Sequence, residues 1–370
     1  MMRTSLRTTV TMAVLALLGF ARQVPAGQPE REIRILADHA LPAEGSMPAD
    51  IRWASDKSVF LLRFLDGVSE IELGDSLKKL RQPVPPPHVL NIGRNTAYGR
   101  LAVSDEHLLF GGGLWHMAWR PIGGAQGGEV VFQSAEFATY DDVDLFGDRL
   151  LILGLRDAPP DIQNDAGIAW LGLLSDRLKS ARLLLKDDNR SREEADWKAS
   201  RCATLSLGAV RFLSNGSFIV VPGTQPGAYL FNPSGQLVRR WSHEEIGLTT
   251  DCGEVPSVEA LIPPHKLTRW LTRHRALDDI LPLPEGPGLL VRSVGNDGKP
   301  RWDLTILGAN RISTYPLPMV GTYPEDRLRG DFRNGKIVLL VTSSEFWRQE
   351  PEDWGGRLIL AELSRTKEKK

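Results

Sequence analysis

The sequence has 370 residues, of which 42% are hydrophobic and 25% charged, and its formal net charge is −1. These values are ordinary for a folded globular protein and leave ample apolar surface for a core. No basic stretch is interleaved with aromatic residues, which argues against nucleic acid as a partner.

Residues 1–26 have the order of a secretory signal peptide. Arg3 and Arg7 precede an apolar run from Val10 to Phe20, and small residues near Ala26 form a cleavage site. The run is too short for a comfortable membrane span, so we expect cleavage and no transmembrane segment afterwards. The expected location is secreted or periplasmic, and the alternative is an uncleaved anchor. Cleavage takes the formal charge from −1 to −4, because residues 1–26 hold three arginines and no acid.

The rest of the chain repeats a hairpin in which a tight turn joins two apolar strands. The clearest copy is VRFLSNGSFIVV, because Asn215-Gly216 between apolar runs is a strong hairpin signal. Further copies turn at Asp56, Asp105, Gly147-Asp148, Glu285-Gly286 and Asn334-Gly335. The second strand of each copy is almost continuously apolar, as expected for a strand that is covered on both faces.

A second, more variable pair of strands follows each hairpin, as in GAYLFNPSGQLVRRW after the fourth copy. The sixth copy has only GRLILAELS before the chain ends, whereas REIRILAD, residues 31–38, has no local partner. A ring of sheets would close if residues 31–38 became the outer strand of the last unit. The pattern predicts an all-β fold, a six-bladed β-propeller of four-stranded antiparallel blades, with residues 27–370 as one domain. A two-domain β-sandwich is the competing fold.

The hairpin YLFNPSGQLVRRW, residues 229–241, carries a resemblance to a known family. Through it the chain resembles the six-bladed propeller superfamily, in particular secreted bacterial propellers related to NHL-repeat proteins. The resemblance covers nearly all of residues 30–365, although the other units lack this hairpin sequence. It implies radially packed blades around a central channel.

The long connections fall on one face of the predicted ring. The turns within hairpins are short, whereas long segments join one hairpin to the next. These segments are 84–98, 156–167, 187–208, 242–276 and 343–356. These segments hold Trp197, Trp270, Trp347 and Trp354, and Trp115 lies in a shorter connection. Long loops are usually functional or disordered, so we expect this face to bind a protein, peptide or glycan. Alternatively, the tryptophans form small satellite cores under the loops.

Two cysteines, Cys202 and Cys252, lie in neighbouring long connections. An even count in an exported protein favours a disulfide between them, and free thiols are the alternative. Such a bridge would close a loop of about 50 residues and stabilise the fold by roughly 4 kcal/mol.

The 242–276 insertion is predicted to contain a short helix, at PPHKLTRWLTRHRAL from Pro263 to Leu277. Pro264 fits the start of a helix. Apolar residues and a histidine then recur at helical spacing, which predicts one stripe against the propeller. The stripe consists of Leu267, Trp270, Leu271 and His274.

Charged residues recur near the start of the first strand of each hairpin. Units one, three and five have Asp50, Asp142 and Asp279 there, and units two and six have Arg100 and Arg329 one residue later. Three carboxylates facing a common axis could hold Ca²⁺ or another divalent cation. Together the acids and arginines could instead orient a polar ligand. The alternative is that each aspartate only accepts hydrogen bonds from loop amides.

These patterns favour a binding protein over an enzyme. The enzymatic alternative is a metal-dependent, lactonase-like hydrolase at the channel mouth, whose metal would polarise a carbonyl or activate water. No Glu/Asn pair in register completes the ligand pattern of lactonases. Zincin, phosphate-loop and nucleophile-elbow motifs are also missing from the sequence. The ligand, the substrate and the oligomeric state stay open.

Overall fold

The computed structural model describes most of the predicted strands and few of the connections between them. The described residues are 31–43, 46–63, 67–80, 99–111, 116–122, 130–133, 142–154, 167–176, 178–186, 208–222, 227–248, 272–323, 326–342 and 355–365. Within these ranges the chain consists of β-strands and one short helix. The prediction of an all-β propeller of four-stranded antiparallel blades is confirmed.

The strands form six four-stranded sheets, each of which is antiparallel. The first sheet contains β2 (Pro48–Trp53), β3 (Ser58–Arg63), β4 (Gly67–Glu72) and β5 (Lys78–Lys79). The second contains β6 (Arg100–Val103), β7 (His107–Gly111), β8 (His116–Pro121) and β9 (Val130–Gln133). The third contains β10 (Asp142–Phe146), β11 (Arg149–Leu153), β12 (Gly167–Leu173) and β13 (Arg182–Lys186).

The remaining sheets follow the same order along the chain. The fourth contains β14 (Gly208–Phe212), β15 (Phe218–Pro222), β16 (Ala228–Phe231) and β17 (Leu237–Trp241). The fifth contains β18 (Ala276–Leu283), β19 (Gly286–Val294), β20 (Pro300–Leu307) and β21 (Ile312–Val320). The last contains β22 (Arg327–Arg333), β23 (Lys336–Thr342), β24 (Gly356–Arg365) and, from the other end of the chain, β1 (Arg31–Leu41). The first strands of consecutive sheets contact one another, and β22 contacts β2.

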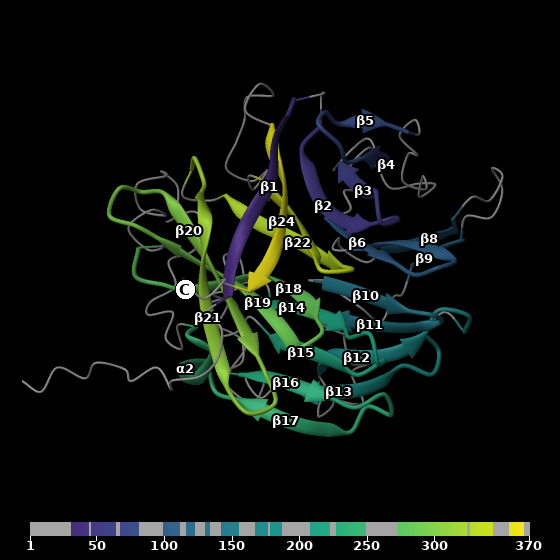
Figure 1. The fold of residues 1–370 in the computed structure, drawn as a ribbon. Helices are drawn as coiled ribbons and strands as arrows, with labels where there is room; N and C mark the ends of the chain where they lie inside the picture. The colour runs from purple at the N-terminus through teal and green to yellow at the C-terminus, as the bar shows by residue number, and fades with distance from the viewer. Residues whose placement is uncertain are drawn as a thin grey trace, which may run out of the picture.

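The pairing of β1 with β24 confirms the predicted closure of the last sheet. The two strands run antiparallel from Arg31 opposite Arg365 to Leu41 opposite Gly356. In Figure 1 the purple strand β1 lies along the yellow strand β24. The strand is longer than the predicted 31–38, and it covers the outer edge of β24, an edge that would otherwise be open to pairing with other chains.

Each pair of neighbouring sheets shares its own apolar core. The core between the first and last sheets contains Ile51, Leu61, Val338 and Leu340, all almost fully buried. The second strand of a sheet is covered on both faces, and every residue of β3 and β15 is buried. The second strands are therefore continuously apolar because both of their faces are covered, as we predicted.

The two Asn-Gly turns differ in backbone conformation. Asn334 and Gly335 both have positive φ, 49° and 79°, as a two-residue type I′ hairpin requires. At Asn215-Gly216 only Gly216 has positive φ, and its N–H donates to the carbonyl of Leu213. This connection is a longer loop that ends at a left-handed glycine. The expectation of positive φ at both residues was wrong there, because the hairpin closes between Leu213 and Ser217.

Among the described residues of the 242–276 insertion there is one short helix, which precedes the predicted one. Helix α2 (His243–Ile246) begins at Ser242 with a capping box that includes Glu245, and it ends at Gly247 in the left-handed conformation. Residues 263–271 of the predicted helix lie outside the described residues. Its last two residues, Ala276 and Leu277, instead begin β18, because pairing with β19 buries Leu277 opposite Val291. The prediction of a helix up to Leu277 was therefore wrong at its end.

Several predicted features lie outside the described residues. They are the signal peptide at 1–26, both cysteines, Cys202 and Cys252, Trp115, the four tryptophans of the long connections and most of those connections themselves. No helix in the described ranges is long and apolar enough to cross a membrane.

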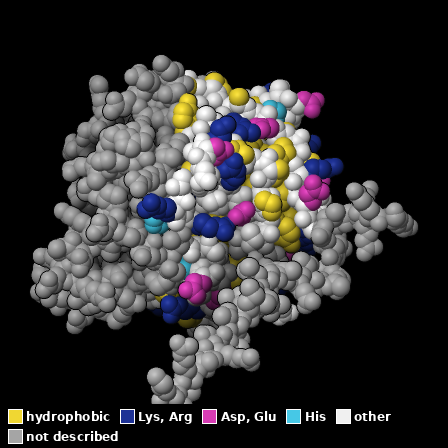
Figure 2. All heavy atoms as spheres, turned by 90° about the vertical axis from the view of Figure 1, so that its left-hand side faces the viewer, with side chains coloured by type: hydrophobic (Ala, Val, Ile, Leu, Met, Phe, Trp, Pro, Cys, Tyr) yellow, Lys and Arg dark blue, Asp and Glu magenta, His cyan; other side chains and the backbone are white. Residues whose placement is uncertain are grey.

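One flank of the described surface carries charges of both signs. Figure 2 shows basic and acidic side chains interspersed with small apolar areas on this flank. Neighbouring charges pair on the described surface, for example Asp297 with Arg301 at 2.8 Å and Asp38 with Arg357. Exposed pairs of this kind contribute little to stability, and their mixture of signs gives this flank no single-sign field.

Candidate functional site

The five predicted site residues lie in one layer of the innermost strands. Asp50 is on β2, Arg100 on β6, Asp142 on β10, Asp279 on β18 and Arg329 on β22. The equivalent position of β14 is occupied by Ala209. All five charged side chains are buried, with 0–6% of their surface exposed. The structure therefore brings them to a common level, inside the ring of strands and away from bulk solvent.

The aspartates of this layer hydrogen-bond one sheet to the next. Asp50 Oδ2 accepts the backbone N–H of Leu101 at 2.8 Å, across the seam from β2 to β6. Asp142 Oδ2 accepts from Val210 N–H at 2.9 Å, and Asp279 Oδ2 from Gly330 N–H at 3.0 Å. Each carboxylate thus satisfies a buried amide of the following inner strand, which is a structural use of these acids.

The arginines of the layer compensate the buried carboxylates. Arg100 Nε lies 3.1 Å from Asp142 Oδ1, and Arg329 donates to the carbonyl of Asp278. Burial raises the pKa of Asp142. Burial alone would also raise the pKa of Asp279, but the guanidinium groups of Arg211, Arg52 and Arg329 outweigh it and hold that pKa well below its ordinary value. Asp279 is therefore a firmly ionised anchor.

The same aspartates were the candidates for a divalent cation. Asp50 Oδ1 already accepts from Ile51 N–H at 2.8 Å and from Arg52 Nη1 at 2.7 Å. A cation would have to displace amide donors or approach the arginines that compensate these carboxylates. Among the described residues, no group of three or more His, Cys, Asp or Glu side chains could hold a metal ion.

A second charged layer, which the sequence analysis missed, lies two residues further along the same strands. It contains Arg52, Asp144, Arg211 and Asp331, with Ala102 and Leu281 at the equivalent positions of β6 and β18. A charged residue flanked by apolar ones, as in Ile51-Arg52-Trp53 or Val210-Arg211-Phe212, was the available signal. Because strand side chains repeat with a period of two, these residues face the same way as the first layer.

Hydrogen bonds to aspartates of the first layer and to backbone carbonyls hold the two arginines of the second layer in place. Arg211 donates from Nη2 to Asp279 Oδ1 at 2.8 Å and from Nε to the carbonyl of Ile280 at 3.0 Å. Arg52 donates from Nη1 to Asp50, as above, and to the carbonyl of Ile51 at 2.7 Å. The guanidinium groups are therefore held in place by the first layer.

The two aspartates of the second layer accept from amides of the next sheet. Asp144 Oδ2 accepts from Phe212 N–H at 2.6 Å, and Asp331 Oδ2 accepts from Trp53 N–H at 2.9 Å. The other oxygen of Asp144 lies 3.7 Å from Arg211 Nη1, which is an ion pair without a hydrogen bond.

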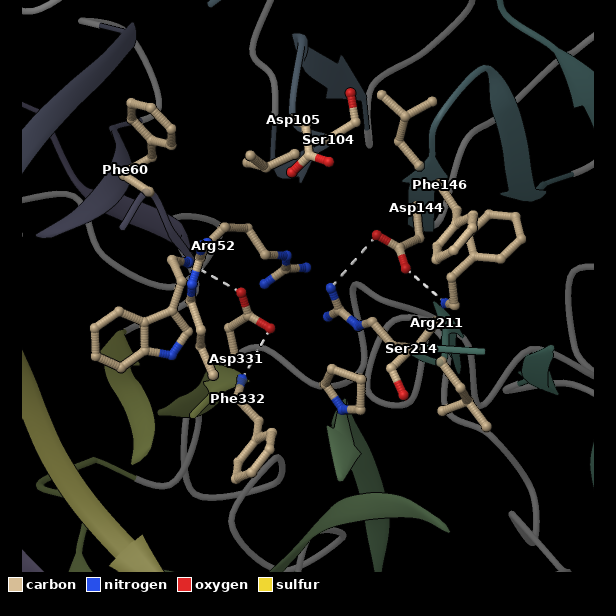
Figure 3. Close-up of a pocket in the computed structure, with 18 of the residues that line it drawn as sticks. Arg52, Phe60, Ser104, Asp105, Asp144, Phe146, Arg211, Ser214, Asp331 and Phe332 are labelled. Carbon is tan, nitrogen blue, oxygen red and sulfur yellow. Dashed lines mark hydrogen bonds and ion pairs between the residues drawn. The ribbon is translucent and has the colours of Figure 1, made fainter. Parts of the chain in front are cut away.

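These four side chains form the floor of a cavity of about 770 Å³. The cavity opens among the turns that join the first and second strands of the sheets, at the C-terminal end of each first strand. Its walls include Trp53, Phe60, Phe146, Phe212 and Phe332. Its polar rim includes Ser104, Asp105, Ser214, Arg333 and Asn334. Figure 3 shows Arg52, Arg211, Asp144 and Asp331 pointing toward one another across this space. A cavity of this size is typical of small-molecule sites.

The floor carboxylates are weaker acids than usual. Burial raises the pKa of Asp144 from its ordinary value of 3.8 to about 6, although Arg211 and Arg52 lower it in part. Burial likewise raises the pKa of Asp331. Burial opposes the charge of Arg211 and Arg52 too, but the surrounding aspartates raise the pKa of both above the ordinary arginine value. The arginines are always charged, whereas the two carboxylates respond to their surroundings.

No protein-family model and no curated protein sequence matches the chain. Solved structures resemble its fold. A member of the DUF4221 family from Bacteroides vulgatus is 7% identical, with a TM-score of 0.51, and the match covers 92% of this chain and 100% of that one. Virginiamycin B lyase from Staphylococcus aureus is 11% identical over 90% of this chain and 100% of its own, with a TM-score of 0.44. The WD40 β-propeller domain of Doa1 is 12% identical over 88% and 96%, with a TM-score of 0.41. At these identities the likeness concerns the fold alone.

Proposed function

We propose that this protein is an exported binding propeller whose ligand occupies the cavity among the hairpin turns. The observation that carries the proposal is the cavity of about 770 Å³ with four charged side chains at its floor, of which Arg52, Asp144 and Arg211 are buried and Asp331 is partly buried. Ionised groups are costly to bury, and here they are fixed from behind while one side still faces a space of ligand size. Preorganised polar groups at the base of an aromatic pocket are a general feature of binding sites.

Binding without chemistry is favoured over the metal-dependent hydrolase. The carboxylates proposed for a metal, those of Asp50, Asp142 and Asp279, accept hydrogen bonds from amides of the following sheet. Their use as hydrogen-bond acceptors between sheets accounts for the recurrence of acids in alternate units. We therefore propose no catalytic step.

In the sequence the long connections join the other ends of these strands. Our sequence-based proposal that they bind a protein, peptide or glycan concerns residues outside the described ranges and stays a prediction, as does the Cys202–Cys252 disulfide.

We also infer that the sheets are the blades of a single six-bladed ring related to the NHL-like propellers. The contact of β22 with β2 supports the ring.

A fragment screen tests whether the cavity binds ligands. Ligand-observed NMR on the mature protein would be repeated with Ser214→Trp, which places a bulky ring at the rim from an exposed position. Ser76→Trp is the matched control, because Ser76 is also exposed but lies in the β4–β5 turn. We expect a set of fragments that bind the wild type and Ser76→Trp but not Ser214→Trp. If no fragment distinguishes the two variants, the cavity is not the binding site.

A further inference from the structure

The floor of the cavity has a two-fold arrangement around the channel axis. The inner strands contact one another in the order β2, β6, β10, β14, β18, β22 and back to β2. Three steps separate β2 from β14, so Arg52 and Arg211 stand on opposite sides of the axis. Three steps also separate β10 from β22, so Asp144 and Asp331 are opposite each other.

The hydrogen bonds repeat the same two-fold relation. Asp331 accepts the N–H of Trp53, the residue after Arg52, and Asp144 accepts the N–H of Phe212, the residue after Arg211. Each half of the floor is thus one carboxylate, one guanidinium and one aromatic ring, contributed by two adjacent sheets. Ala102 and Leu281, in the same layer of the remaining strands, separate the halves with apolar side chains.

We propose that this floor binds a neutral polyhydroxylated ligand, a sugar ring, and this inference rests on the proposed function. A sugar hydroxyl donates one hydrogen bond and accepts another. Adjacent hydroxyls can therefore donate to a carboxylate and accept from a guanidinium on the same side of the floor. Because of the two-fold relation, the other half of the floor offers a second carboxylate and guanidinium pair to hydroxyls on the opposite side of the sugar ring.

The spacing of the floor groups leaves hydrogen bonds for a ligand to make. Arg211 Nη1 and Asp144 Oδ1 lie 3.7 Å apart, too far for a good hydrogen bond with each other. Buried polar groups without partners are costly, so a ligand that satisfies them gains affinity.

The balance of charge favours a neutral ligand over an ionic one. The floor presents two guanidinium and two carboxylate groups on alternate sides, so an anion that reaches one arginine also approaches an aspartate. A cation meets the converse problem. A ligand with hydroxyl groups avoids both penalties, because it brings no charge that must lose its water shell.

The walls suit the other surface of a sugar. The rings of Trp53, Phe212 and Phe332 line the cavity beside the charged groups, and Phe146 stands at its rim with 38% of its surface exposed. The C–H faces of a pyranose are apolar and can pack on aromatic rings, while its hydroxyl groups at the edge reach the polar floor. Aromatic walls over a polar floor thus match the two kinds of surface on one ring.

The test compares neutral sugars with their charged counterparts. The probes are the methyl glycosides of glucose, galactose and mannose and, for each, those of the corresponding uronate and amino sugar, at pH 7 by saturation-transfer NMR and calorimetry. We expect at least one neutral glycoside to bind, with its uronate and amino-sugar counterparts at least tenfold weaker. Ser214→Trp should weaken binding at least tenfold, and Ser76→Trp should leave it unchanged.

A variant of the floor tests whether the charged floor groups themselves contact the sugar. Asp144→Asn keeps the size of the side chain and should weaken the bound glycoside at least tenfold while circular dichroism shows a folded protein. If the variant does not fold, Ser214→Trp still decides the question. Binding of the uronate or the amino sugar alone, or no binding of any glycoside, would overturn the sugar inference. Fragments that are lost only in Ser214→Trp would then still support the proposed function.

Discussion

The carboxylate of Asp331 in the last sheet accepts the backbone N–H of Trp53 in the first sheet at 2.9 Å. The two residues are 278 positions apart in the chain, and this hydrogen bond crosses the seam where the ring of inner strands closes. Asp331 also accepts from its neighbour, Phe332 N–H, at 2.9 Å. One side chain therefore both joins the ends of the ring and stands at the floor of the cavity.

Replacement of Asp331 by alanine should destabilise the fold by about 2–3 kcal/mol, because Trp53 and Phe332 lose the acceptor of their N–H groups. Urea unfolding followed by tryptophan fluorescence would measure the change. Asp56→Ala is the control, since Asp56 is 64% exposed and pairs with Arg333 on the surface. It should cost no more than about 1 kcal/mol. Equal losses for both variants would contradict a role for Asp331 in closing the ring.

The pKa of Asp144 predicts a distinct dependence of stability on pH. Burial raises that pKa from 3.8 to about 6, so the folded state binds the proton more tightly than the unfolded state. The contribution of Asp144 to stability is full below pH 4 and is lost as the pH rises through 6. The loss amounts to about 3 kcal/mol.

Unfolding of the wild type and of Asp144→Asn between pH 4 and 7.5 isolates this effect, because the other titrating groups are common to both proteins. The free energy of unfolding of the wild type relative to the variant should fall as the pH rises. A difference that does not change with pH would mean that Asp144 has an ordinary pKa.

The packing of β7 against β10 leaves no room for a methyl group at Gly111. A Cβ atom there would lie 2.8 Å from Cγ2 of the buried Val143. Gly111→Ala should therefore destabilise the protein by roughly 1–3 kcal/mol. Gly74→Ala, whose Cβ would meet nothing nearer than 3.7 Å, should stay within about 0.5 kcal/mol.

A compensating change distinguishes overpacking from a backbone effect. Val143→Ala removes both methyl groups that the new Cβ would meet, so the double variant should be more stable than the sum of the single losses, by about 1 kcal/mol or more. Thermal and urea unfolding of the four proteins would give the coupling energy. Simple additivity would indicate that the cost of Gly111→Ala lies in the backbone.

Removal of residues 27–41 should prevent the last sheet from closing. Strand β1 buries Ile33 and Leu41 and covers the edge of β24. We expect the truncated protein to aggregate or to lose its cooperative thermal transition, because an uncovered strand edge pairs with other chains. Removal of residues 27–30 alone is the control and should leave the transition in place. A soluble, cooperatively folding protein without β1 would show that the strand is dispensable.

The candidate site was predictable only in part. Counting along the predicted strands indicated that five charged residues occupy equivalent positions, and the structure places them in one buried layer. They are Asp50, Arg100, Asp142, Asp279 and Arg329. The second layer had a signal, a lone charge within each apolar inner strand. It was missed because only the start of the first strand of each hairpin was expected to carry site residues.

The pattern of apolar runs and turn residues was enough to predict the strands, their pairing within each unit and the closure of the last sheet by β1. These are local consequences of apolar runs and turn residues, and an edge strand without a partner can complete only a sheet that lacks one. Which charged side chains meet could not be predicted in this way and depends on the folded ring. Carboxylates and guanidinium groups from sheets far apart in the chain converge when the inner strands form a ring, and their burial and distances depend on that packing. The cavity at the turn end has the same origin, since no single unit contains it.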